Sequence, residues 1–83
     1  MQEKKIGTIT HFFDKISVGI IMLDDMLKVG NTIKIQGSTT NFEQEIVEMQ
    51  YDRQNIEKGE QGQEVGVKMN EIVRVGDEVY LLE

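Results

Sequence analysis

The side chains of this chain that could do chemistry are few, and they do not form a catalytic set. His11 is the sole histidine, and it lies in an alternating stretch between Thr10 and Phe12 with no acid or nucleophile beside it. A general base needs a partner that orients it. A histidine on the surface or rim of a strand is therefore the favoured interpretation. The absence of cysteine rules out thiolate chemistry and disulfides.

Two further groups of polar residues could bind a ligand or attack a substrate. Asp24 and Asp25 form a carboxylate pair, but calcium needs about 6–8 oxygen ligands, and no longer acidic array follows. A solvated turn is the better interpretation. Ser17 and Ser38 stand outside any G-x-S-x-G motif, and the chain has no G-x-x-x-x-G-K-[ST] loop. We therefore predict no catalytic residue, no metal, no cofactor and no enzymatic activity.

Length and charge narrow the class of protein. The chain has 83 residues and a net charge of −6, from 15 acidic and 9 basic residues. This length predicts a single domain over residues 1–83. An acidic surface disfavours nonspecific binding to a polyanion, which requires cationic groups facing phosphates. No apolar run reaches the roughly 18 residues of a membrane span, and the first residues do not resemble a signal peptide. We expect a cytoplasmic protein without a membrane partner.

The elements that must position these residues are predicted to be strands. Residues 18–29 could also form a helix, but Gly19 and the β-branched Ile20 and Ile21 favour a strand followed by a turn. Strands are expected at residues 4–13, 18–23, 32–36, 42–51, 65–69 and 78–82, with a bulge near Ile46. Six short strands separated by turns predict a small, closed, mostly antiparallel β-barrel. The expected core comprises Ile9, Ile20, Ile33, Ile35, Met49, Val65, Val67, Val79 and Leu81.

One turn signal occurs twice. Residues 27–35 read LKVGNTIKI and residues 73–81 read VRVGDEVYL. In both, Gly30 or Gly76 is followed by Asn31 or Asp77, residue types that tolerate positive φ. We predict that each glycine forms a tight turn that leads into a strand.

These motifs resemble the β-barrel second domain of translational GTPases such as elongation factor Tu and initiation factor 2. Residues 27–33 are similar to that family's I/L-K-x-G-D/E-x-V/I, and residues 73–79 to its I-x-x-G-D-V/I-L. Residues 49–51 and 56–67 resemble its V-E-M and A-G-x-N-V-G stretches. The resemblance spans nearly the whole chain. It implies a stand-alone homologue of that domain, like the small elongation-factor-like proteins.

The resemblance also implies a binding site. Elongation factors hold the aminoacylated end of tRNA with a glutamate and an asparagine, at the positions that Gln50 and Glu64 occupy here, next to Val65. A translation-associated or RNA-binding module is the function so implied. Glu64 departs from the family pattern because it adds an anion where phosphate would lie.

A second function class follows from the pattern of the residues. Tyr80 alternates with Val79 and Leu81 and should face outward, where it could join Lys34 in a binding patch. The alternative function is a protein–protein adaptor, which the acidic charge and the altered pocket residues favour and which resembles the related barrel at the C-terminus of collagenase-like peptidases. The partner is macromolecular in both cases, either protein or RNA, and weak self-association is compatible with the adaptor. No small-molecule substrate is expected.

Overall fold

The computed structural model describes residues 3–82, and every regular element within them is a β-strand. The predicted all-β class is confirmed, including the stretch where a helix was the alternative. No helix in the described part of the chain is long and apolar enough to cross a membrane. The strands are β1 (Glu3–Phe13), β2 (Val18–Leu23), β3 (Leu27–Lys28), β4 (Thr32–Gln36), β5 (Asn41–Glu45), β6 (Met49–Tyr51), β7 (Gln54–Ile56), β8 (Lys58–Gly59), β9 (Glu64–Lys68) and β10 (Glu78–Leu82).

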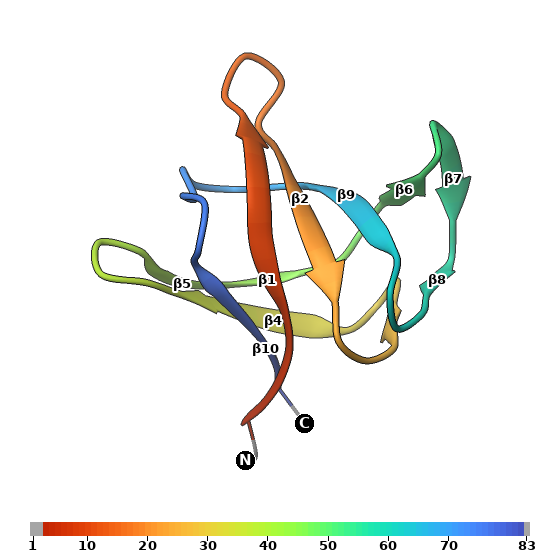
Figure 1. Cartoon of the computed structure of the whole chain (residues 1–83), viewed down its shortest axis with the longest axis horizontal. Coiled ribbons are helices and arrows are strands. Elements are labelled where there is room, and N and C mark those ends of the chain that lie inside the picture. Colours follow the sequence, from red (N-terminus) through yellow and green to blue (C-terminus); the bar gives the residue numbers. More distant parts are fainter. Residues whose placement is uncertain (1–2, 83) are drawn as a thin grey trace.

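Eight strands form one antiparallel sheet in the order β5-β4-β10-β1-β2-β9-β6-β7, and β3 pairs separately with β8. In Figure 1 the β1–β2 hairpin stands upright, while β4 and β5 run across its lower half, so the sheet coils around its own core. No strand ladder joins the two outer strands, β5 and β7, within residues 3–82. The prediction of a closed, six-stranded barrel was therefore wrong in both strand number and closure.

The additional strands come from segments that were expected to be continuous or irregular. Residues 42–51, predicted as one bulged strand, form β5 and β6, and residues 46–48 between them belong to no strand. β6 then pairs with β7 across Asp52 and Arg53, which both have positive φ (52° and 65°). A two-residue hairpin with a type I′ turn needs this conformation at both turn positions. Arginine is not a typical residue there, so the hairpin was missed.

The core is the best-predicted part of the fold. Seven of the nine expected core residues are buried, whereas Ile20 and Leu81 are only partly buried. Ile6 and Ile9 of β1 are both buried although strict alternation would place them on opposite faces. The β1 register shifts between Lys5 and Gly7 and again after Ile9. Such a shift turns the following side chains to the other face of the strand.

The two turns predicted from the repeated phrase are confirmed. Gly30 and Gly76 have φ of 98° and 95°. In each turn the residue after glycine donates its N–H to a carbonyl three residues earlier, from Asn31 to Lys28 (3.1 Å) and from Asp77 to Arg74 (3.0 Å). The side-chain oxygens of Asn31 and Asp77 accept the N–H of Lys28 and Arg74 in return. Both turns have the positive φ at the third position that defines type II geometry.

A third turn repeats this arrangement without the sequence signal. Gly62 has φ of 89°, and Gln63 bonds Glu60 through both its backbone N–H and its side chain. The longer glutamine takes the place of Asn or Asp. Each of the three turns exchanges two hydrogen bonds with one buried apolar residue of another segment. The glycine N–H donates to the carbonyl of that residue, and the N–H of that residue donates to the carbonyl of the residue after glycine. These residues are Ile46 for the Gly30 turn, Leu23 for the Gly62 turn and Ile9 for the Gly76 turn.

Candidate binding groove

Tyr80 and Lys34, the residues selected from the pattern, do lie together. They are opposite each other on the adjacent strands β10 and β4. However, their polar ends already have partners. The Tyr80 hydroxyl donates to Glu78 at 2.8 Å, Lys5 pairs with the same carboxylate at 3.3 Å, and Lys34 pairs with Glu3 at 3.2 Å.

This network also affects ionisation. The hydrogen bond from Tyr80, followed by pairing with Lys5, holds the pKa of Glu78 below its ordinary value. The same hydrogen bond raises the pKa of Tyr80, because ionised tyrosine could no longer donate to the carboxylate. Tyr80 is half-buried. This face therefore offers few unpaired groups to a ligand.

The three residues assigned through the resemblance are in different environments. Gln50 is exposed on β6, and its amide donates to Asn55 at 3.0 Å. Glu64 is exposed at the start of β9 and accepts a hydrogen bond from Thr10 at 3.1 Å. The side chain of Val65 is fully buried in the core. Of the three, Gln50 alone lines the groove described next.

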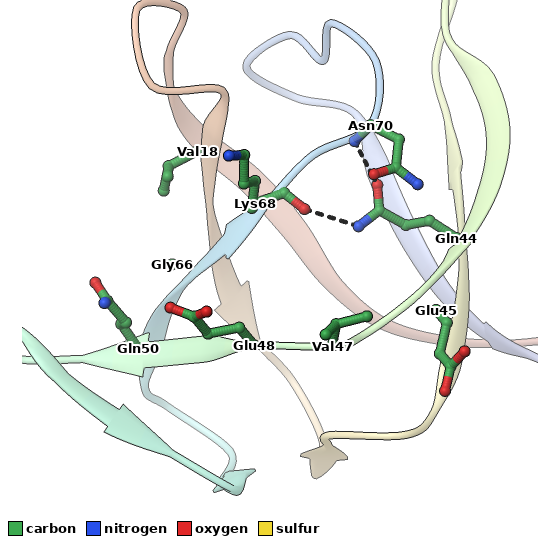
Figure 2. Close-up of a pocket in the computed structure, with 9 residues that line it drawn as sticks. All are labelled: Val18, Gln44, Glu45, Val47, Glu48, Gln50, Gly66, Lys68 and Asn70. Carbon is green, nitrogen blue, oxygen red and sulfur yellow. Dashed lines mark hydrogen bonds between the residues drawn. The ribbon is translucent and has the colours of Figure 1, made fainter.

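A groove of about 450 Å³ lies where β9 and the segment between β5 and β6 diverge. Figure 2 shows the two segments running apart beyond Gly66 and Gln50, with Lys68 and Asn70 along one of them, Glu48 and Val47 along the other, and Gln44 at the far end. We call it the β5–β9 groove. Its lining comprises Val18, Gln44, Glu45, Val47, Glu48, Gln50, Gly66, Lys68 and Asn70. Its volume is within the range of ligand pockets.

One end of this groove is spanned by the amide of Gln44, a residue that is 6% exposed. Its Nε2 donates to the carbonyl of Lys68 and its Oε1 accepts the N–H of Asn70, both at 2.8 Å. A side-chain amide has the same donor and acceptor as a peptide group. Gln44 therefore replaces the missing strand ladder between β5 and β9 with two hydrogen bonds.

The middle of the groove has polar groups without such partners. Within residues 3–82 no ion pair involves Glu45, Glu48 or Lys68. Val47, beside them, is 78% exposed and is the most exposed large apolar residue described. Sequence reasoning missed this site. The available signal was Gln44, a polar residue on the inward side of β5 between the buried Phe42 and Ile46.

The described residues show no arrangement suited to catalysis. His11 is exposed and stacks on Phe13, with ring centroids 6.3 Å apart. Asp25 pairs with Lys4, and the hydrogen bond from this lysine, followed by one from the Met26 N–H, lowers the pKa of Asp25. No group of three or more His, Asp or Glu side chains within residues 3–82 could hold a metal ion. The groove can bind by hydrogen bonds, charge and apolar contact.

Comparisons with known proteins connect this fold to peptidases. No family model matches the chain. It is 45% identical over 80 residues to an uncharacterized protease of Methanocaldococcus jannaschii and 30% identical over 81 residues to a collagenase of Porphyromonas gingivalis. Each alignment covers 95% of this chain but only 20% and 22% of the relative. The chain thus spans about a fifth of the length of these curated relatives.

A solved structure has the same fold. The C-terminal domain of a Geobacillus thermoleovorans protein assigned to the U32 peptidases matches with a TM-score of 0.90 and 12% sequence identity, covering 96% of this chain and 93% of that domain. These findings overturn the attribution to the translational GTPases, because the relatives and the solved structure are peptidase proteins. The turn motifs that carried that resemblance describe how the chain turns into strands. Gln50, Glu64 and Val65 rested on that attribution alone and stay predictions.

Proposed function

We propose that this chain is a noncatalytic accessory domain that works with a U32-type peptidase by binding protein. The observation that carries the proposal is the extent of the sequence match. The alignments cover 95% of this chain and about a fifth of the M. jannaschii protease and the P. gingivalis collagenase. About four fifths of each relative lies outside the match and has room for a separate catalytic domain.

The site supports the same conclusion. A protease needs an activated nucleophile, or a water activated by a metal ion or by a pair of carboxylates. Within residues 3–82 the single histidine, His11, is exposed on β1, and no cluster of metal-binding side chains is present. The β5–β9 groove instead combines apolar, amide and charged groups, which suits recognition of polypeptide.

A domain exchange tests this function. The matched region of the M. jannaschii protease is deleted in one variant and replaced by this chain in another. We expect deletion to reduce cleavage of a protein substrate by about tenfold, equivalent to about 1.4 kcal/mol, with little change for a short peptide. Replacement should restore the loss, and the 83-residue chain alone should cleave neither substrate. Activity of the chain alone, or failure of the replacement to restore cleavage, would overturn the proposal.

A further inference from the structure

The segment between β5 and β6 carries unpaired backbone at the edge of the groove. Both backbone groups of Ile46 are bonded, to Asn31 and Gly30. By contrast, Val47 and Glu48 lie outside every strand, and within residues 3–82 no turn or loop hydrogen bond involves their backbone groups. Figure 1 shows this segment as an irregular connection from β5 to β6. Exposed, unpaired backbone of this kind can act as a template for an added strand.

The main sheet has an opening beside β9 that an added strand could occupy. On one side β9 pairs with β2 over five residue pairs, but on the other side it pairs with β6 only at Gly66 and Val67. Beyond that point, within residues 3–82, β5 reaches β9 and the residues just after it through two hydrogen bonds of the Gln44 amide, to Lys68 and Asn70. An extended segment lying along residues 47–48 would enter the opening between these strands.

The charges of the groove indicate the kind of segment that fits. Glu45 and Glu48 have no counter-ion within residues 3–82, and Lys68 is the one cation of the lining. The lining therefore has a net charge of −1, in a chain of net charge −6. A cation near the two carboxylates is favoured and an anionic backbone such as RNA is disfavoured. Val18 and Val47 offer apolar contact beside these charges.

We propose that the β5–β9 groove binds an extended peptide whose backbone pairs with Val47 and Glu48 and whose lysine or arginine side chain contacts the Glu48 carboxylate. The inference deepens the proposed accessory function and rests on it, since a domain that works with a peptidase meets polypeptide chains. The backbone pairing supplies affinity that does not depend on sequence. The Glu48 carboxylate and the valines supply the preference for a basic residue next to apolar ones.

Binding is tested with the 83-residue chain and three synthetic peptides. The first has eight residues with one central lysine flanked by valines, the second has glutamate in place of lysine, and the third is the first peptide with N-methylated backbone. Fluorescence anisotropy gives the affinities. We expect the lysine peptide to bind at least about tenfold more tightly than either of the others. Equal affinity for the lysine and glutamate peptides, or for the methylated peptide, would overturn the proposal.

Variants and amide exchange then locate the site. Glu48→Lys should weaken binding of the lysine peptide about tenfold, whereas the matched charge reversal Glu60→Lys, outside the groove, should leave it unchanged. Both residues are exposed, so circular dichroism should show unchanged folds. In the complex the amide protons of Val47 and Glu48 should exchange more slowly. Protection elsewhere, peptide-independent dimerisation through this groove, or tighter binding of a single-stranded RNA than of the lysine peptide would contradict the assignment.

The two proposals can fail separately. Peptide binding is measured without any peptidase. If the domain exchange does not restore cleavage but the peptide still binds, the accessory function is rejected and peptide binding by the groove is retained. If the domain exchange restores cleavage but the peptide does not bind, peptide binding by the groove is rejected and the accessory function is retained.

Discussion

The strands around β10 and the strands around the β5–β9 groove satisfy their polar groups in different ways. β10 pairs with β1 and β4 over five residues each, and Glu78 on its surface is bonded by Lys5 and Tyr80. At the groove, β9 shares two residue pairs with β6, and one side-chain amide spans the rest. A well-buried core thus does not require a closed sheet. The groups left without partners are those available to a ligand.

The largest expected effect is at the amide that spans the groove. Gln44→Leu removes both hydrogen bonds of a buried side chain and leaves the Lys68 carbonyl and the Asn70 N–H without partners. We expect the free energy of unfolding in urea to fall by about 2–3 kcal/mol. The control Gln50→Leu removes one exposed hydrogen bond and should cost less than about 0.5 kcal/mol. Equal losses for the two variants would show that the amide does not hold the strands together.

A smaller effect is expected on the well-paired side, at the turn before β10. A Cβ at Gly76 would have no heavy atom within 4 Å, so substitution tests the backbone conformation alone. Gly76→Val should cost about 1–3 kcal/mol because its φ of 95° is strained for a β-branched residue. Gly76→Asn should cost less, since asparagine tolerates positive φ. An unchanged thermal midpoint for the valine variant would contradict this role of the turn.

The smallest effect concerns the carboxylate network beside β10 and is visible only through pH. Because the folded state lowers the pKa of Glu78 below its ordinary value of 4.5, pairing contributes stability above that pH. The contribution is lost as the pH falls through the lowered pKa. Glu78→Gln should therefore lose this part of the acid dependence, and salt should shrink the difference between the variant and the natural chain. Glu45→Gln, at the groove, is the matched control. Identical acid dependence of Glu78→Gln and the natural chain would refute the network's contribution.

Much of the fold could be predicted because its signals are local. Alternation identified β4 and β10, and the β-branched residues identified β2, all with the bounds observed. The glycine phrases identified the turns before β4 and β10. A strand exposes alternate residues to opposite faces whatever it pairs with. Glycine at positive φ likewise needs no long-range contact. Because turns of this kind occur in unrelated β-proteins, the same motifs led to the wrong attribution to the translational GTPases.

Only the tertiary structure decided how the strands pair and where they stop pairing. The bulges that bury both Ile6 and Ile9, the hairpin at Asp52, and the open edge at Val47 depend on partners distant in the sequence. Alternation predicts which face of a strand a residue lies on but not the register of the strand. A register shift of one residue moves every side chain after it to the opposite face. Gln44 shows the limit most clearly. By itself it is a polar residue in an apolar series, and it becomes part of a site only where Lys68 and Asn70 meet it.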